Sequence, residues 1–345
     1  MKYPFFLLPL SLILLSFAFL TSCSQAGKAD TAFYYWKQTF ALDKPQQALL
    51  EKVAGQKLYV RFFDIKWDVK GNRAYPEAVI NFKQKVNATQ ITPVIFITNQ
   101  TFEKLDLPGV DSLATNTQQL LTQLSTTQQL NYQQVQFDCD WSLGTKDKYF
   151  HFLKTFKAIS SKQLEATIRL HQVKYQIKTG IPPVDRGVLM FYNMGKISAR
   201  TEDPNSIYNP KDAANYISYL PKYLLPLDIA LPLFSWSIHI RNGVVIQVYG
   251  KIGKTNLSDA NNFQPTSHKN MFKAIRSFFT DGVYVKAGDI FKLEETDKEL
   301  LDQAAKQLAE HLKKDEKRTI IYYEIGNLDP SVFKASDLKE ISARF

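Results

Sequence analysis

Two carboxylates and an arginine occupy positions from which they could carry out acid–base chemistry. Asp138 and Asp140 lie two residues apart in the strand-like segment 134–141, and Arg169 lies near the end of the next such segment. Side chains alternate along a strand, so both carboxylates share one face. A carboxylate beside an arginine keeps its charge, whereas one beside a second carboxylate has a raised pKa and can donate a proton. The alternative interpretation of the same residues is a buried structural ion network.

Other polar and aromatic side chains follow apolar segments in the same way. If those segments are parallel strands of a barrel, their carboxyl ends meet at one site. Glu324 and Asp64 are then further candidate acids, and His171 could serve if its pKa lies near neutral. The catalytic candidates are Asp138, Asp140 and Glu324. The candidate substrate-binding residues are Arg61, Asp64, Trp141, Arg169, His171, Tyr192, Asn193 and Trp236.

Strand-like segments that could position these residues alternate with helical patterns. Alternation over roughly 300 residues predicts a closed (β/α)8 TIM barrel. The rival is an open doubly wound sheet, which would usually carry a glycine-rich turn where Trp36-Lys37-Gln38 follows the first strand. The expected strands are Ala32–Trp36, Lys57–Ile65, Pro93–Thr98, Gln134–Trp141, Glu165–His171, Gly187–Tyr192, Ile229–Ser235 and Thr319–Ile325. The expected helices are Pro45–Ala54, Pro76–Val86, Asp111–Gln129, Lys146–Ile159, Pro210–Tyr219, Asn270–Phe279 and Lys298–Lys313.

A long segment separates the seventh and eighth expected strands. Within it, Asn242–Gly250 and Gly282–Phe291 have the composition of extra hairpin strands. We therefore expect an inserted hairpin region, about residues 240–295, of the kind that shapes a substrate groove.

Four of the strand-like segments resemble motifs of family 18 chitinase-like barrels. Phe137–Asp140 is similar to the core of the D-x-x-D-x-D-x-E motif on the fourth strand, and Met190–Asn193 is similar to M-x-Y-D on the sixth. Phe33–Trp36 and Leu231–Phe234 resemble the first and seventh strands. The resemblance implies a TIM barrel that handles carbohydrate.

The chain departs from that family's motifs at the position of the catalytic acid. The motif's glutamate corresponds to Ser142, its first aspartate to Val135 and the sixth-strand aspartate to Asn193. Substrate-assisted hydrolysis needs a carboxylic acid to protonate the leaving oxygen. Either another acid supplies the proton, or the barrel does not hydrolyse its ligand.

The first residues form a targeting segment. Lys2 precedes the uncharged apolar run Phe5–Leu20, which is short for a membrane span. Leu20-Thr21-Ser22-Cys23 resembles the bacterial lipoprotein box. The resemblance implies a signal peptide over residues 1–22, lipid such as palmitate on Cys23, a tether over 23–30 and a single barrel domain over 31–345. It also implies a membrane-anchored lipoprotein of the bacterial cell envelope that faces the periplasm or the exterior.

Composition excludes several other classes of protein. The 345 residues are 45% apolar and 22% charged, an ordinary globular balance, and two cysteines cannot build a disulfide framework. The net charge of +10 is scattered, which argues against nucleic-acid binding and is compatible with weak attraction to anionic lipid or acidic glycan. We expect no cofactor and no metal.

Three functional hypotheses follow. The first is a glycoside hydrolase that acts on an extracellular or cell-wall polysaccharide through carboxylate acid–base chemistry. The second is a non-catalytic glycan-binding lipoprotein on a degenerate hydrolase barrel, and the third is a structural or assembly lipoprotein. The expected partners are a polysaccharide or oligosaccharide and, through the lipid anchor, a membrane.

Overall fold

Eight parallel strands close into a barrel in the computed structural model, which describes residues 29–88, 90–314, 316–328 and 332–345. The predicted signal peptide, Cys23 and nearly all of the predicted tether lie outside these residues. The first strand closes the barrel because it pairs in parallel with both the second and the eighth. The strands are β1 (Asp30–Tyr35), β3 (Lys57–Asp68), β6 (Gln90–Ile97), β7 (Gln134–Asp138), β8 (Gln163–Arg169), β9 (Arg186–Met190), β10 (Leu227–Pro232) and β18 (Thr319–Tyr323).

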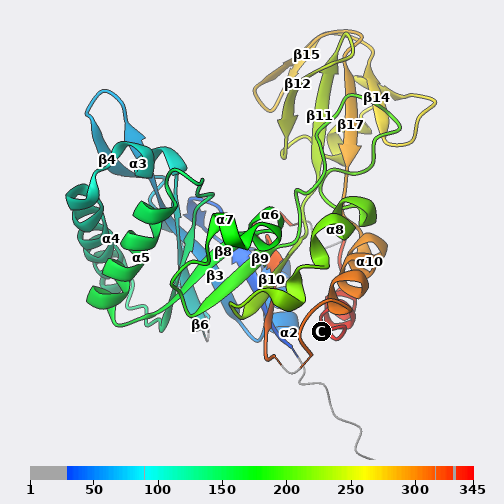
Figure 1. Ribbon diagram of the computed structural model, residues 1–345. Coiled ribbons are helices and arrows are strands. Elements are labelled where there is room, and N and C mark those ends of the chain that lie inside the picture. The colour runs from blue at the N-terminus through cyan, green and yellow to red at the C-terminus, as the bar shows by residue number, and fades with distance from the viewer. Residues whose placement is uncertain (1–28, 89, 315, 329–331) are drawn as a thin grey trace, which may run out of the picture.

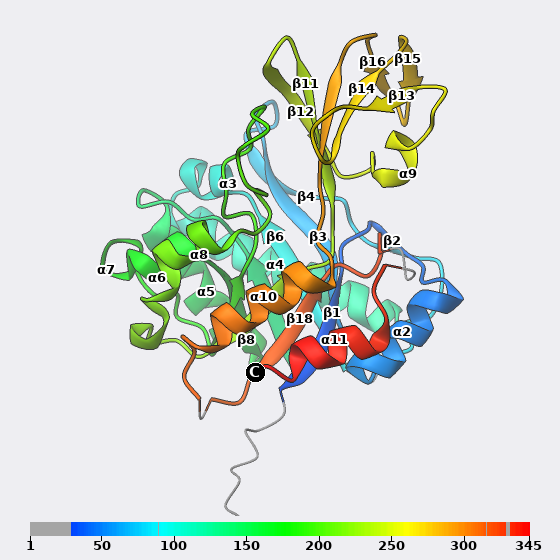
Figure 2. The same cartoon turned by 90° about the vertical axis from the view of Figure 1, so that its right-hand side faces the viewer.

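Helices surround the barrel because each strand buries apolar side chains on its outer face. On β7, for example, Phe137 packs edge-on against Phe152 and Phe156 of a covering helix. Figure 2 shows the red and orange C-terminal helices beside the blue N-terminal strand. The longer helices are α2 (Lys44–Ala54), α4 (Leu107–Thr127), α5 (Lys146–Ser160), α8 (Pro210–Ile217), α10 (Lys298–Ala309) and α11 (Ala335–Ser342). The shorter ones are α3 (Asn99–Lys104), α6 (Leu170–Lys174), α7 (Gln176–Thr179), α9 (Lys254–Leu257) and the 3-10 turn η1 (Leu220–Lys222).

The predicted (β/α)8 barrel is confirmed, and two of the expected helices are wrong. Residues 76–86 instead contain the end of β4 (Arg73–Glu77), which pairs antiparallel with the extension of β3, and the short strand β5 (Asn81–Phe82), which pairs with β2 (Thr39–Phe40). Ala78 interrupts any helix there because its φ is 49°. Residues 270–279 form strands instead of the second expected helix.

The chain between β10 and β18 builds a second sheet that projects beyond one end of the barrel (Figure 1). Its five strands follow the order β12-β11-β17-β14-β13, and β15 pairs with β16 beside them. This sheet has its own apolar core, in which Phe291 packs edge-on against Phe263. The strands are β11 (Trp236–Arg241), β12 (Val244–Tyr249), β13 (Phe263–Pro265), β14 (Met271–Ala274), β15 (Phe278–Thr280), β16 (Val283–Val285) and β17 (Ile290–Glu294).

Candidate functional site

A cavity of 610 Å³ opens at the carboxyl ends of β7, β8 and β9. This is the end of the barrel at which the second sheet also emerges, and we call it the mouth (Figure 1). Its position is where TIM barrels carry their functional residues. The cavity is lined by Asp140, Trp141, Ser142, Arg169, Leu170, His171, Gln172, Met190, Tyr192, Asn193, Met194 and Tyr216.

The carboxylate that lines the mouth cavity is paired with an arginine through both of its oxygens. Arg169 Nε donates to Asp140 Oδ1 at 2.6 Å, and its Nη2 donates to Oδ2 at 3.2 Å. Burial opposes the charge of Arg169, but the carboxylates of Asp138 and Asp140 outweigh it and raise the pKa of the guanidinium. The side chain of Asp140 is still 58% exposed, so the pair remains open to a ligand.

Asp138 lies deeper than Asp140, on the inner face of β7. Only 6% of this residue is exposed, and Thr167 Oγ1 on β8 donates to its Oδ1 at 2.7 Å. Burial raises the pKa of Asp138 above its usual value, although Arg169 and Thr167 oppose the shift. Asp138 can therefore hold a proton more readily than an exposed aspartate, but it is not among the residues that line the cavity.

Ser142, at the position where the family motif has its acid, lines the cavity with a hydroxyl. Ser142 Oγ lies 3.2 Å from Thr145 Oγ1, and the Ser142 backbone N–H donates to Asn99 Oδ1 at 3.2 Å. These bonds fix the turn that begins α5. A serine hydroxyl cannot replace a carboxylic acid as proton donor at this position.

Glu324 and the pair Arg61–Asp64 lie on the other side of the barrel and do not line the mouth cavity. Glu324 is 4% exposed, and its Oε2 accepts from the backbone N–H of Trp36 at 3.0 Å. Burial raises its pKa above the usual value. Arg61 forms an ion pair with Asp64, and its guanidinium lies 5.5 Å from the ring centroid of Trp36.

The structure does not give Trp141 the free indole face that we expected for ligand binding. Its ring stacks on Tyr149 of α5 at a centroid distance of 5.3 Å, and its Nε1 donates to the Thr179 carbonyl at 2.9 Å. Trp141 is 4% exposed, so it mainly packs β7 against the surrounding helices. This matches the outward direction that alternation along the strand assigns to it.

The remaining candidates lie at or near the mouth with different degrees of exposure. Tyr192 is buried, and its hydroxyl lies 2.9 Å from Met190 Sδ. Asn193 and His171 are exposed on the rim, where burial of part of the ring lowers the pKa of His171. Trp236 is half-buried, and its Nε1 donates to Glu294 Oε2 at 2.9 Å.

Four half-buried rings form what we call the aromatic floor of the mouth: Trp36, Phe234, Trp236 and Tyr323. The Tyr323 ring lies 5.5 Å from Trp36 and 5.9 Å from Phe234, centroid to centroid. Tyr192, which lines the cavity, packs 5.5 Å from Tyr323 and so joins the floor to the cavity. We did not expect a role for Tyr323, although its place beside Glu324 at the end of the eighth strand was a signal.

A hydrogen-bonded network fills the barrel below the floor. Tyr34 Oη donates to Gln136 Oε1 at 2.7 Å, and Gln136 Nε2 donates to Glu165 Oε2 at 3.3 Å. Tyr59 Oη donates to the other Glu165 oxygen at 3.1 Å. Burial, followed by the charge of Asp228, raises the pKa of Glu165 to about 8. Glu165 was not a sequence candidate, although it shares a strand face with Thr167.

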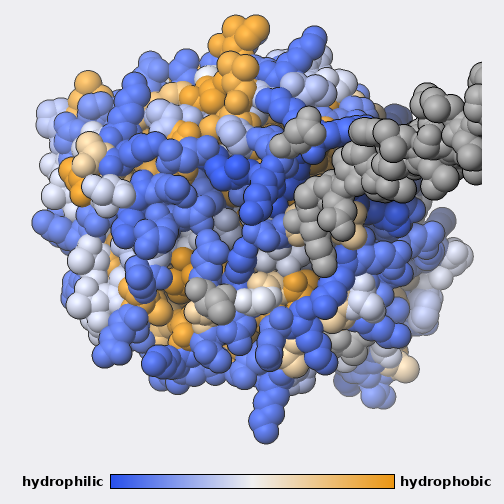
Figure 3. Space-filling view, turned by 90° about the horizontal axis from the view of Figure 1, so that it is seen from below, coloured by the Kyte–Doolittle hydropathy of each residue, from blue (hydrophilic) through white to orange (hydrophobic). Residues whose placement is uncertain are grey.

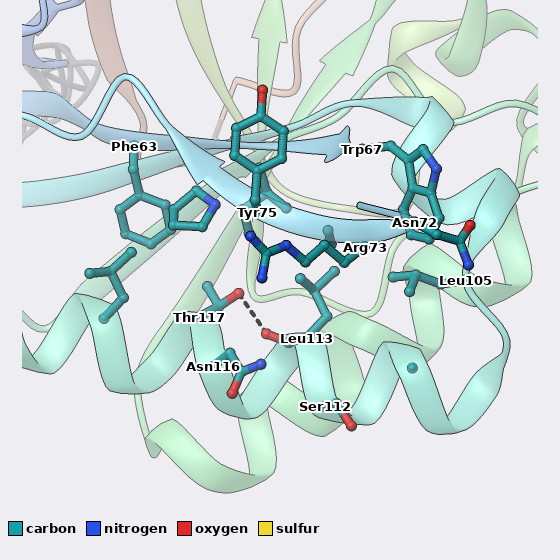
Figure 4. Close-up of a pocket in the computed structure, with 15 residues that line it drawn as sticks. Phe63, Trp67, Asn72, Arg73, Tyr75, Leu105, Ser112, Leu113, Asn116 and Thr117 are labelled. Atoms are coloured by element: carbon teal, nitrogen blue, oxygen red, sulfur yellow. Dashed lines mark hydrogen bonds between the residues drawn. The ribbon is translucent and has the colours of Figure 1, made fainter. Parts of the chain in front are cut away.

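A second cavity, of 440 Å³, lies outside the barrel between the β3–β4 hairpin and α4 (Figure 4). Its lining is mainly apolar, and the Thr117 hydroxyl donates to the Leu113 carbonyl of its own helix at 2.7 Å. Trp67 is half-buried at its edge. None of the catalytic or substrate-binding candidates named above lines this cavity, so it is separate from the mouth.

The described residues offer neither a clustered metal site nor a membrane-crossing helix. No group of three or more histidine, cysteine, aspartate or glutamate side chains in this part of the chain is arranged to hold a metal ion. Among the same residues, no helix has both the length and the apolar character that crossing a bilayer requires.

Comparisons with known proteins establish the fold. No protein-family model matches the chain, and no curated protein matches its sequence. Among solved structures, human YKL-39, described as a pseudo-chitinase with retained chitooligosaccharide binding, has a TM-score of 0.50 at 12% identity over 91% of this chain and 99% of its own. YKL-39 solved in the presence of chitooligosaccharides also has a TM-score of 0.50, at 11% identity over 90% and 98%. A chitinase-like agglutinin from Robinia pseudoacacia has 0.49, at 11% identity over 91% and 98%. The chain therefore has the chitinase-like TIM-barrel fold.

Proposed function

We propose that this chain is an exported, lipid-anchored protein that binds glycan at the barrel mouth without cleaving it. One observation carries the proposal. The aromatic floor is joined through Tyr192 to a polar cavity whose lining carboxylate, Asp140, is bonded to Arg169 through both oxygens.

The mouth offers both kinds of contact that a sugar needs. The rings of the aromatic floor are half-buried, and an aromatic ring has a flat apolar face on which a pyranose can stack. Asn193, His171 and the open Asp140–Arg169 pair supply hydrogen-bonding groups on the adjoining rim. A concave, partly aromatic site with a few polar groups is the usual form of a small-ligand site.

The same mouth lacks a well-placed proton donor among the described residues. A glycosidase acid must hold a proton and reach the glycosidic oxygen. Asp140 is held by Arg169, whereas Asp138 and Glu324 are buried outside the cavity lining. His171 lines the cavity, but its lowered pKa leaves the ring without the extra proton at neutral pH. Binding without hydrolysis fits this arrangement better than the acid–base chemistry that we first expected of Asp138, Asp140 and Glu324.

Hydrolysis remains the second candidate because the pKa of Asp138 is raised. Asp138 and Asp140 would then share the carboxylate work, with Arg169 setting their charges. The comparison with YKL-39 supports the binding proposal only by analogy of fold.

The test is a glycan screen with a chain that begins at Ser24. Every strand and helix of the described fold lies between Asp30 and Ser342, so this chain retains the complete fold. Affinity electrophoresis on soluble polysaccharides, together with chitooligosaccharide titrations, should detect binding, and a reducing-end assay should detect no product. Tyr323→Ala should weaken binding about tenfold, because a stacked ring contributes about 1.4 kcal/mol.

Trp67→Ala provides the matched control. It removes a half-buried indole from the hairpin cavity outside the mouth and should leave binding unchanged. If the wild type releases product and Asp138→Asn with Asp140→Asn abolishes the release, the protein is a hydrolase. If no glycan binds or shifts the melting temperature, the structural or assembly hypothesis replaces ours.

The anchor and the domain organisation belong to the same proposal. We take residues 1–22 as signal peptide, Cys23 as the lipidated residue, 23–30 as tether and 31–345 as one barrel domain with an insertion near 240–295. The location is then the bacterial cell envelope, with the protein facing the periplasm or the exterior. Incorporation of labelled palmitate that Cys23→Ser abolishes is the expected result, and labelling that survives Cys23→Ser would contradict it.

A further inference from the structure

A third cavity, of 420 Å³, lies at the end of the barrel opposite the mouth. We call it the basal cavity. Its walls come from the first residues of the barrel strands, so it is coaxial with the barrel. Each of the eight strands contributes: Asp30 (β1), Lys57 (β3), Gln90 (β6), Gln134 (β7), Gln163 (β8), Arg186 (β9), Asp228 (β10) and Thr319 (β18).

The basal cavity carries more positive than negative side chains. Lys57 Nζ pairs with Asp30 at 2.8 Å, and Arg186 Nη2 pairs with Asp228 at 2.8 Å. Two further cations, Lys317 and Arg318, also line it and leave two positive charges in excess over these pairs. Arg318 also forms an ion pair of 4.0 Å with Glu316, which does not line the cavity.

Uncharged groups of the basal cavity also suit an anion. The amides of Gln90, Gln134 and Gln163 lie on three neighbouring strands, and Gln90 Nε2 donates to Gln134 Oε1 at 3.1 Å. Tyr59 lines the inner end of the basal cavity and donates to Glu165. The raised pKa of Glu165, about 8, keeps that carboxyl protonated at neutral pH. Amide and cationic donors around an uncharged inner end of the cavity can bind a phosphate oxyanion through charge-assisted hydrogen bonds.

The position of the basal cavity relates it to the proposed anchor. Strand β1 begins at Asp30 in the cavity wall, so the described chain starts at this end of the barrel (Figure 1). Cys23 precedes Asp30 by seven residues, which span at most about 25 Å when fully extended. Seen from below, most of this face is hydrophilic (Figure 3). A lipid on Cys23 would therefore hold a polar, cationic end of the barrel against the bilayer.

We propose that the basal cavity binds the phosphate of an anionic phospholipid headgroup in the membrane that anchors the chain. The inference rests on the proposed anchor and is independent of glycan binding. A headgroup seated on the barrel axis turns the mouth and the second sheet away from the bilayer. The anchor then supplies attachment, and the basal cavity supplies orientation.

The test uses the chain that begins at Ser24, so that binding does not depend on the lipid at Cys23. Sedimentation with vesicles of phosphatidylglycerol and phosphatidylcholine should give at least tenfold stronger partitioning than vesicles of phosphatidylcholine alone. Lys57→Gln with Lys317→Gln should weaken that partitioning about fivefold for each charge removed. Glycan binding at the mouth should be unaffected in every variant, which separates this test from the test of the proposed function.

Two matched double variants decide whether the cavity or the general surface charge is responsible. Lys52→Gln with Lys314→Gln removes two exposed lysines that precede β3 and β18, outside the cavity lining. Lys269→Gln with Lys273→Gln removes two exposed lysines of the second sheet region. Neither should weaken partitioning as much as the cavity variant, and equal weakening by Lys52→Gln with Lys314→Gln would overturn the proposal.

Free phosphate provides the remaining arm. Millimolar inorganic phosphate should compete with vesicles if the cavity recognises the phosphate of the headgroup. Phosphate binding by the isolated chain without preference for phosphatidylglycerol vesicles would overturn the lipid assignment, because it would identify a soluble phosphate site. Equal partitioning onto vesicles with and without phosphatidylglycerol would also overturn the lipid assignment.

Discussion

The two ends of the barrel are built from the same eight strands, yet each uses an arginine–aspartate pair differently. At the mouth, the Asp140 side chain that Arg169 binds is 58% exposed. At the base, the Asp228 side chain that Arg186 binds is 3% exposed and also accepts from the Thr319 backbone N–H at 2.7 Å. Burial of the carboxylate, and not the residue types, therefore decides whether an arginine–aspartate pair stabilises the fold or remains available to a ligand.

Removing the basal arginine should have the largest effect on stability. Arg186→Met leaves the Asp228 carboxylate buried without its partner, which should lower the free energy of unfolding by about 3 kcal/mol. Urea unfolding followed by circular dichroism measures this loss. Adding Asp228→Asn should restore part of it because the stranded charge disappears. A loss below about 1 kcal/mol for Arg186→Met would show that the base is as open as the mouth.

Glu165 lies inside the barrel between the two ends, where burial and the charge of Asp228 at the base raise its pKa. The unfolded carboxyl releases its proton near pH 4.5, whereas the folded one keeps it to about pH 8. The folded state therefore holds the extra proton, and the wild-type chain should lose stability as the pH rises through this range. Glu165→Gln should remove the loss, so the free energy of unfolding of this variant should stay level between pH 5 and pH 8, where that of the wild type falls.

The control for that measurement is Glu299→Gln, an exposed glutamate of α10. It should leave the pH dependence unchanged. Suppose that the free energy of unfolding of Glu165→Gln instead falls with pH as steeply as that of the wild type between pH 5 and pH 8. The Glu165 carboxyl would then be ionised in the folded barrel, contrary to the prediction.

The mouth arginine should give the smallest change in stability. Arg169→Met leaves the exposed Asp140 to water, and the buried Asp138, whose pKa is already raised, can take up a proton. The free energy of unfolding should therefore fall by less than about 1 kcal/mol. Glycan binding, measured by affinity electrophoresis, should weaken in the same variant because the polar side of the cavity loses its cation. A large loss of stability with unchanged binding would reverse the roles that we assign to the two pairs.

The strands could be predicted because their signal is local. Segments such as Ile320–Tyr322 are buried and β-branched or aromatic, and each of the eight expected strands overlaps an observed one. Expected helices failed where Pro76 and its neighbours continue a hairpin, and where residues 271–274 pair within the second sheet. The pairing partners lie outside each expected helical segment, so a pattern within the segment could not reveal them.

The site was harder to predict because small shifts in register decide which side chains meet. Alternation places Tyr59, Arg61 and Phe63 on one face, but a bulge between Arg61 and Phe63 turns Phe63 into the outer core and leaves Asp64 beside Arg61. The aromatic floor combines rings from three parts of the chain far apart in sequence. Only the closed barrel brings them together.

The pairing of β1 with β18 also fixes when the barrel can be completed. A ribosome delivers the chain from its amino end, so Asp30–Tyr35 acquires its last neighbouring strand only after Thr319–Tyr323 has emerged. Until then the growing polypeptide keeps an open seam whose unsatisfied amides could pair with other chains. The barrel therefore cannot close before nearly the whole chain has been made.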